Sequence, residues 1–376
     1  MAKKSHLYEF HIEHGRMTEF GGFDMPLWYG GIIEEHNAVR NSAGLFDVSH
    51  MGRFLVKGEA ASKFLNFVFP SDVAKFKAGR AFYSTLCNDA GGIIDDTITN
   101  KISENEYMVI VNASNRDKDL EWLREHMDNY SVEVDDISDS SALIAFQGPL
   151  ALELLQNFCD VKLDSVKRSH FVFGCVGQEK CLVSRTGYTG EDGFEVVVFD
   201  TPVSDPKKAM KIWDMLLESG KGKGVLPCGL GARDLLRLEA GMCLHGQDID
   251  DTTTPIEASL DVVVNLSKAD SFIGRNPIEK QMLEGVTRKR VAFSMSQSGI
   301  PRHGYELRFA GKKVGAVTSG SFSPLTRKGI GMGYVPPALS GIGSTFGVDI
   351  RGSERMAEVV PVPFYDTTKY GYKRQT

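Results

Sequence analysis

The sequence lacks the features of membrane proteins, of disulfide-rich secreted proteins and of nucleic-acid binders. Its apolar runs, such as Phe64 to Phe69, are far shorter than the ~18 residues that a membrane-spanning helix requires. Its six cysteines form no Cys-x-x-Cys pair, which argues against a zinc site or a disulfide framework and favours a reducing compartment. The formal charge of −6 lacks the basic excess that binding of nucleic acid requires. We therefore expect neither a membrane nor a nucleic acid among its partners.

The N-terminal segment MAKKSHLYEF also lacks targeting features. It has no apolar stretch typical of a signal peptide and no Arg- and Ser-rich stretch typical of a mitochondrial presequence, although a processed form would lack the latter too. We therefore expect a cytoplasmic protein, or a mitochondrial matrix protein if the chain is a processed eukaryotic form.

Common cofactor motifs are absent or fail in their context. GIGMGY (329–334) and GIGSTFG (341–347) look like dinucleotide fingerprints, but neither precedes the helix that would hold a pyrophosphate, so we interpret their glycines as turn residues. GKGKG (220–224) lacks the Ser or Thr of a P-loop, and HIEH (11–14) is not HExxH and fits a solvated helix end. No GxSxG elbow occurs.

The sequence has a globular composition, and its predicted secondary structure changes once along the chain. Its 376 residues correspond to roughly two or three domains, and its 39 glycines predict many turns and strands. Up to about residue 287, helices alternate with antiparallel strands, among which residues 81–112 form a three-strand meander. Helices are expected at 34–43, 59–69, 115–127, 207–219 and 230–241, and further strands at 142–147 and 180–200. From residue 288, short strands alternate with turns, so we predict an α+β protein whose last of three domains is an all-β, jelly-roll-like barrel.

Side-chain alternation draws attention to Asp96. In the expected strand 93–102 it shares a face with Ile94, Ile98 and Ile102, whereas the opposite face is mostly polar. We expect the apolar face to be buried, and burial of a lone carboxylate is costly unless it is paired or its pKa changes. Asp96 is therefore a candidate for chemistry, and the alternative is an ion pair or a contact with backbone N–H groups.

A second carboxylate, Glu195, follows the turn TGYTGEDG and shares a strand face with Val197 and Phe199. The glycines of that turn would let the backbone approach a ligand closely, and the alternative for Glu195 is a buried salt bridge.

The helix expected at 230–241 carries two arginines four residues apart. Asp234 can pair with Arg237, which leaves Arg233 for a carboxylate, either Glu195 or one on a ligand. The alternative is a helix held by surface salt bridges. With Tyr83 and Tyr188 nearby, these groups would suit a flat heterocycle with amines and an acidic tail, of which a pterin is one example.

Several stretches together resemble the T-protein family of the glycine cleavage system, the tetrahydrofolate-dependent aminomethyltransferases. SHMG, GGIIDD, VNASN, TGYTGEDGFE, GLGARDLLRLEAG and the tail PFYDTTKYGYKR carry the resemblance, which extends over essentially the whole chain. SHMG, TGYTGEDGFE and GxGARDxxRLEAG are highly specific in combination, whereas any one alone marks only a wider folate-binding superfamily.

The resemblance implies three domains arranged like a cloverleaf, built of antiparallel sheets with flanking helices. We expect the first domain at 1–50 and 138–230, the second at 51–137 and 231–285, and the barrel at 286–376. The first two would form the folate pocket.

The resemblance also implies the reaction. The lipoylated H protein would deliver an aminomethyl group, and transfer to the co-substrate tetrahydrofolate would release ammonia and form methylene-tetrahydrofolate. No metal, flavin or nicotinamide is needed, and the P and L proteins of the same system would be functional partners.

The family's functional residues map onto positions of this chain. Asp96, the second Asp of GGIIDD, would be the catalytic acid, Glu195 would bind the amine edge of the pterin, and Arg233 would hold an acidic group of the folate or brace Glu195. The residues expected to line the pocket are Met51, Tyr83, Asn112, Tyr188 and, from the tail, Tyr370, with Tyr372 as the alternative.

Two other functions stay open. A folate-dependent demethylase of the same superfamily would not need H protein. A non-catalytic folate-binding relative typically carries a reactive Cys in its signature motif, which the corresponding stretches here lack.

Overall fold

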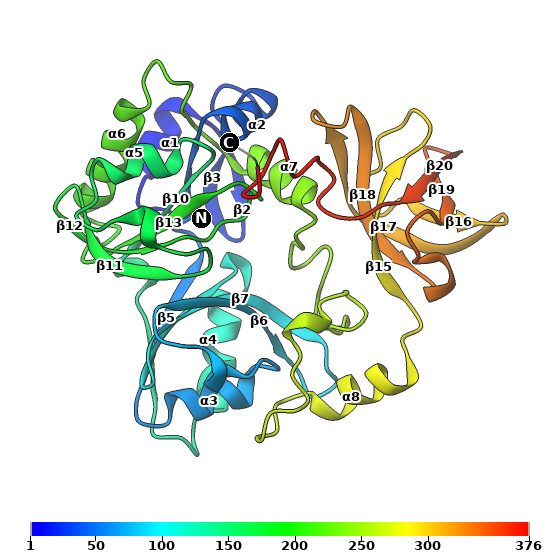
Figure 1. The fold of residues 1–376 in the computed structure, drawn as a ribbon, viewed down its shortest axis with the longest axis horizontal. Coiled ribbons are helices and arrows are strands. Elements are labelled where there is room, and N and C mark those ends of the chain that lie inside the picture. The colour runs from blue at the N-terminus through cyan, green and yellow to red at the C-terminus, as the bar shows by residue number, and fades with distance from the viewer. Residues whose placement is uncertain (1, 375–376) are drawn as a thin grey trace.

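Three open sheets with their helices and a closed β-barrel make up residues 2–374, the part of the chain that the computed structural model describes (Figure 1). The predicted α+β class with a C-terminal all-β barrel is confirmed. The residue boundaries of the three domains stay a prediction. None of the described helices is long and apolar enough to cross a membrane.

The six-stranded sheet has the order β11-β12-β13-β10-β4-β14, in which β14 runs parallel to β4 and the other pairs are antiparallel. Its strands are β4 (Gly44–Asp47), β10 (Ala142–Gln147), β11 (Phe171–Val176), β12 (Glu179–Ser184), β13 (Gly193–Val198) and β14 (Leu226–Pro227). Helices α5 (Ala151–Gln156) and α6 (Lys207–Ser219) pack on it, and Trp213 is fully buried there among the apolar side chains of the sheet.

A small N-terminal unit precedes this sheet. It consists of β1 (Lys3–Lys4), α1 (Tyr8–His14), β2 (Arg16–Phe20), β3 (Phe23–Trp28) and α2 (Ile32–Asn41). The expectation of a solvated HIEH segment is wrong for His11, which is fully buried because it bonds to Asp47 at 2.9 Å and to the hydroxyl of Tyr29 at 2.8 Å.

The five-stranded sheet contains the predicted meander and is antiparallel throughout, in the order β6-β7-β8-β5-β9. Its strands are β5 (Gly52–Lys57), β6 (Arg80–Cys87), β7 (Ile93–Ser103), β8 (Glu106–Val111) and β9 (Glu133–Asp136). Helices α3 (Ala61–Val68) and α4 (Arg116–Glu125) share one apolar core with this sheet. The meander over 81–112 is confirmed.

The barrel closes in the order β15-β18-β17-β16-β19-β20. Its strands are β15 (Lys289–Met295), β16 (Glu306–Phe309), β17 (Lys312–Ser323), β18 (Lys328–Val335), β19 (Thr345–Ile350) and β20 (Ser353–Val359). GIGMGY lies inside β18, so the prediction that its glycines form a turn is wrong. A Cβ on Gly331 would come within 2.5 Å of the Phe293 ring, so close packing explains this glycine.

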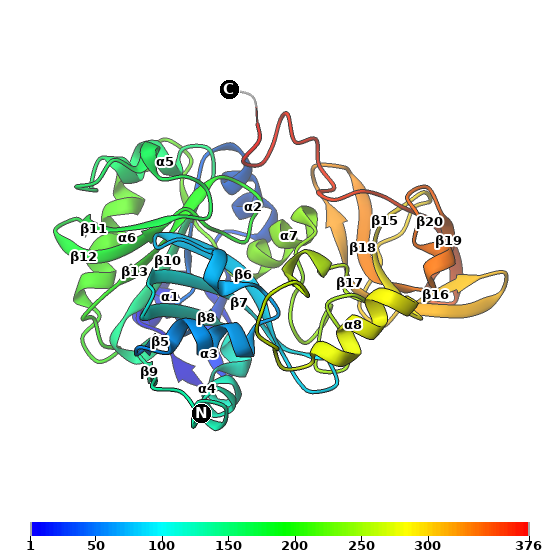
Figure 2. The same ribbon diagram turned by 60° about the horizontal axis from the view of Figure 1, so that its bottom comes forward.

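Helix α7 (Leu230–Ala240) lies between the N-terminal unit and the barrel (Figure 2) and contacts α2, β3 and β17. It ends at Gly241, whose φ of 76° is a left-handed conformation that glycine adopts without strain. Helix α8 (Arg275–Glu284) is not predicted by the sequence patterns, because Ile278 alone among its residues is buried and no apolar stripe marks it.

Candidate functional site

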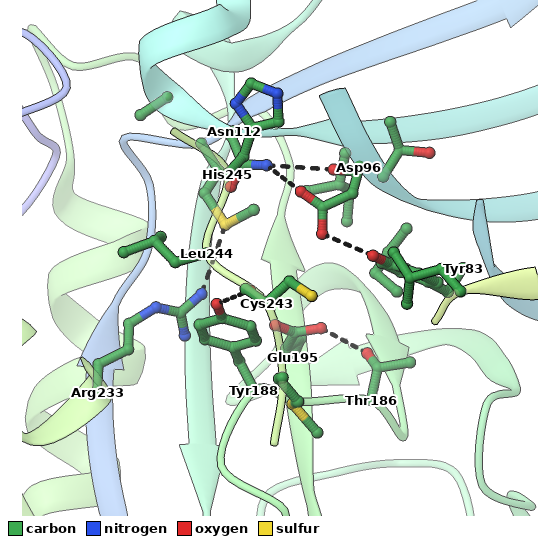
Figure 3. A pocket seen from close by; sticks show the side chains of 18 of the residues that line it. Tyr83, Asp96, Asn112, Thr186, Tyr188, Glu195, Arg233, Cys243, Leu244 and His245 are labelled. Carbon is green, nitrogen blue, oxygen red and sulfur yellow. Dashed lines mark hydrogen bonds between the residues drawn. The ribbon is translucent and has the colours of Figure 1, made fainter. Parts of the chain in front are cut away.

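A cavity of about 410 Å³ lies where the six-stranded sheet, the five-stranded sheet, α7 and the loop after α7 meet. All of the site residues expected from the sequence, except the tail tyrosines Tyr370 and Tyr372, line it: Met51, Tyr83, Asp96, Asn112, Tyr188, Glu195 and Arg233. Figure 3 shows Asp96 with Tyr83 and Asn112 on one side, and Glu195 with Thr186 on another.

Asp96, on β7, has both carboxylate oxygens engaged by neutral donors. Asn112 Nδ2 donates to Oδ1 at 2.9 Å, and the hydroxyl of Tyr83 donates to Oδ2 at 3.0 Å. Within residues 2–374, Asp96 forms no ion pair with Lys, Arg or His. Burial, reinforced by the neighbouring Asp95 carboxylate, raises the pKa of Asp96 to about 6.

The prediction that the apolar face of β7 is the buried one is only partly right, because the polar face is buried as well. On the polar face, Asp95 and Thr97 are buried, whereas Asp96 and Ile98 on the apolar face are half-buried. Asp96 and Ile98 line the cavity, and Thr97 also contributes to its lining. The polar face can enter the core because its carboxylate is satisfied, and the apolar face forms a cavity wall.

Asp95 is satisfied by two asparagines that follow β8. Its Oδ2 accepts from the backbone N–H of Asn112 at 2.9 Å, and its Oδ1 accepts from Nδ2 of Asn112 and of Asn115, each at 2.7 Å. Asn115 Nδ2 also lies 2.9 Å from His245 Nδ1, and His245 Nε2 lies 3.1 Å from the carbonyl of Ile93. These contacts favour the neutral tautomer with the proton on Nε2.

Glu195, on β13, is only 8% exposed and has a neutral hydrogen-bonding partner. The hydroxyl of Thr186 donates to Oε2 at 2.6 Å, and no hydrogen-bond partner within residues 2–374 reaches Oε1. The alternative of a buried salt bridge is therefore not realised in the described part of the chain. Its predicted shared face with Val197 is confirmed by the register, since both residues belong to the side of the sheet that meets the cavity.

Close packing explains one glycine, Gly187, in the turn before Glu195. A Cβ on Gly187 would come within 1.8 Å of Gln147 Oε1, so a larger residue would require the hydrogen-bonded Gln147 amide to shift. The hydroxyl of Tyr188 donates to the carbonyl of Cys243, which fixes the ring against the loop after α7.

Arg233 presents a guanidinium group without an acidic partner among the described residues. Its Nη2 lies 3.8 Å from Met51 Sδ, and the group stacks 4.7 Å from the centre of the Tyr188 ring. Burial lowers the pKa of Arg233, and the nearby Glu195 carboxylate opposes that shift. The predicted pairing of Arg237 with Asp234 is confirmed at 2.7 Å, and it leaves Arg233 available as expected.

The tail tyrosines lie differently from each other. Tyr370 is outside the cavity lining, with its ring 6.5 Å from that of Tyr365. The ring of Tyr372 stacks 3.4 Å from the guanidinium carbon of Arg168, which does line the cavity.

Sequence reasoning missed several lining residues. They include Arg168, Arg185, His245 and Arg290. Only a weak sequence signal pointed to His245: it is a polar residue in the short loop directly after the helix that carries Arg233. Among residues 2–374, no group of three or more His, Cys, Asp or Glu side chains is arranged to hold a metal ion.

Comparison with known families covers most of the chain. Residues 7–268 match the family described as GCVT N-terminal domain, and residues 288–366 match the glycine cleavage T-protein C-terminal barrel domain.

Individual relatives agree with this match. An aminomethyltransferase of Halothermothrix orenii is 46% identical over 363 residues, covering 96% of this chain and 99% of the relative. An aminomethyltransferase of Geobacillus thermodenitrificans is 43% identical over 371 residues, covering 98% and 100%. The crystal structure of glycine cleavage system aminomethyltransferase T from Bartonella henselae aligns with a TM-score of 0.90 at 34% identity and covers 99% of each chain.

Proposed function

This chain belongs to the glycine cleavage T-protein family and is an aminomethyltransferase of the glycine cleavage system, and we propose that its donor is lipoylated H protein and its acceptor tetrahydrofolate. In the proposed reaction, the aminomethyl carbon is bound to the lipoyl sulfur and to an amine. Ammonia leaves, the carbon becomes the methylene that bridges two amine nitrogens of tetrahydrofolate, and the sulfur departs as a thiol of dihydrolipoyl H protein.

The observation that carries this proposal is the set of unpaired charges in one cavity. Asp96 and Glu195 lack cationic hydrogen-bonding partners, and Arg233 lacks an acidic partner, within the described residues. Charged groups that are removed from water and left without partners are costly to maintain, so they fit a ligand that supplies the missing partners. A folate would supply such partners, because the amines of its pterin can donate to the two carboxylates and the carboxylates of its tail can pair with Arg233.

Asp96 is proposed to orient the folate and to transfer a proton near the reacting nitrogen. Its raised pKa supports this role, because an acid–base group works best when its pKa lies near the operating pH. Tyr83 and Asn112 hold the two oxygens in place, so that the carboxylate is positioned before the ligand arrives.

Glu195 is proposed to bind the amine edge of the pterin, using Oε1 that the protein leaves without a partner. Arg233 is proposed to hold an acidic group of the folate, with Met51 and Tyr188 as neighbours. Of the two tail tyrosines, we propose Tyr372 as the residue that reaches the ligand, because it stacks on a lining arginine, whereas the sequence had favoured Tyr370.

The remaining partners follow from the system. We propose that the P and L proteins supply and recycle the lipoylated donor. The bacterial origin of the relatives supports a cytoplasmic location.

The test mixes the protein with aminomethyl-loaded, lipoylated H protein and tetrahydrofolate. Ammonia and methylene-tetrahydrofolate should form in equal amounts, and omission of either substrate should abolish both products. Binding of folate without either product would overturn the proposal and favour a demethylase or a non-catalytic folate-binding protein.

A further inference from the structure

Asp119 is a carboxyl group buried behind the cavity wall without a donor to bind. It lies on α4, its side chain is fully buried, and no donor hydrogen within residues 2–374 reaches either carboxyl oxygen. Burial, reinforced by the adjacent Asp95 carboxylate, raises the pKa of Asp119 far above that of a free aspartate. An ionised group in this position would pay the full desolvation penalty with nothing to offset it.

Asp119 lies one helical turn after Asn115 on α4, and Nδ2 of Asn115 donates to Asp95 Oδ1 at 2.7 Å. The Asp119 side chain is thereby placed beside the Asp95 carboxylate, whose charge contributes to the raised pKa of Asp119. Two carboxyl groups in contact share a hydrogen bond only if one of them carries a proton. Asp95 already accepts three hydrogen bonds from Asn112 and Asn115, as an ionised carboxylate does. The proton of the pair therefore belongs on Asp119, which has no other partner.

Asn112 extends this contact to the cavity. Its Nδ2 donates to Asp95 Oδ1 at 2.7 Å and to Asp96 Oδ1 at 2.9 Å. The orientation of the amide is thus fixed by the same carboxylate that Asp119 contacts. The observed hydrogen bonds therefore connect Asp95 through Asn112 to Asp96, and a proton on Asp119 would extend them to α4.

We propose that Asp119 is held as a neutral carboxylic acid that donates to Asp95 and, through Asn112, positions Asp96 for the reaction, an inference that rests on the proposed role of Asp96. Asp119 does not line the cavity, so it is a positioning residue. The charged groups around it are Asp95 and Asp96 on β7 and Lys118 on α4. Lys118 does not neutralise Asp119 by contact, because its Nζ donates to the carbonyl of Ile94 at 2.8 Å.

Two substitutions separate a neutral donor from an ionised group. Asp119→Asn keeps the size and supplies an N–H donor to Asp95, whereas Asp119→Leu keeps the bulk and supplies none. The same changes at Asp117, which lies on α4 with its side chain 86% exposed, serve as matched controls.

The expected results differ between the two variants. Asp119→Asn should keep the kcat of the unmodified protein, and Asp119→Leu should lower kcat ~10- to 100-fold because the reacting group is misplaced. In Asp119→Leu the acid limb of the kcat–pH profile should also move to higher pH. Without that donor, Asp95 and the Asn112 amide that it orients would shift, and the ionised form of Asp96 would lose part of its hydrogen-bonding support.

A measurement independent of activity decides the protonation state. Isotope-edited infrared spectra at neutral pH should show a protonated-carboxyl C=O band that disappears in Asp119→Asn and persists in Asp117→Asn. Absence of that band in the unmodified protein, or equal loss of kcat in folded Asp119→Asn and Asp119→Leu, would overturn the inference. If the Leu variant does not fold, the spectra of the unmodified protein and the Asn variant still decide. Failure of the unmodified protein to form methylene-tetrahydrofolate would instead refute the proposed function.

Discussion

The hydroxyl of Tyr83 donates a 3.0 Å hydrogen bond to Oδ2 of Asp96, across the paired strands β6 and β7. A hydrogen bond to a carboxylate stabilises its ionised form and so lowers its pKa, here against the larger opposing effects of burial and of Asp95. The protonation of the proposed catalytic group is thus set partly by a neighbouring phenol.

Tyr83→Phe should therefore raise the pKa of Asp96 further. If Asp96 works in its ionised form, the acid limb of the kcat–pH profile should move up by about one pH unit or less. The matched control is Tyr107→Phe, which removes a buried hydroxyl that has no hydrogen-bond partner among residues 2–374. An acid limb that stays in place in Tyr83→Phe would show that this bond does not control the titration.

Asp96→Asn keeps the size of the side chain and removes its charge and its proton transfer. We expect turnover to fall by ~10²-fold or more, which is the usual scale for a positioned acid–base group. The fold should persist, as measured by circular dichroism and thermal unfolding, and Asp89→Asn in the exposed turn before β7 is the control. Full activity of Asp96→Asn would remove the catalytic role.

Arg233→Ala should mainly weaken folate binding. Loss of a charge-assisted hydrogen bond should raise the Kd for tetrahydrofolate ~10-fold or more, as measured by calorimetry. Arg233→Lys should recover only part of the affinity, because an ammonium group lacks the planar fork that binds a carboxylate twice. An unchanged Kd in Arg233→Ala would indicate a purely structural arginine.

Asp119→Asn should change the pH dependence of stability. The pKa of Asp119 rises from 3.8 to about 11 on folding, so the folded protein binds a proton that the unfolded chain releases. Stability linked to this group is complete below the unfolded pKa and is lost as pH rises, by at most about 1.4 kcal/mol per pH unit. As pH rises from about 5 to 9, the unfolding free energy of Asp119→Asn, measured by urea titration, should increase relative to that of the unmodified protein. A pH-independent difference, like that expected for Asp117→Asn, would contradict a protonated Asp119.

Elements with strong local patterns could be predicted from the sequence. The alternation over 81–112 specified the meander, and the apolar stripe of 207–219 specified α6 with its bounds. The pairing of Arg237 with Asp234 followed from their spacing on one helix.

The site was predictable as residues and less so as geometry. Alternation singled out Asp96 but not the direction that each face of β7 would take, because that depends on which face the helices cover. The contacts of Asp95 and of Glu195 depend on side chains from other strands and loops. The contact of His245 with Asn115 joins residues 130 positions apart, and no local pattern records such a distance.

The loop after α7, which forms one wall of the cavity, is fastened to the barrel. Asp248 in this loop accepts from Arg237 at 2.6 Å and from Thr318 of β17 at 2.5 Å, and its carbonyl accepts from the hydroxyl of Tyr334 at 2.7 Å. The barrel therefore stabilises the position of this loop, although the barrel itself contributes little to the cavity lining. A ligand that enters meets a surface already set in shape, so little of its affinity is spent on ordering that wall.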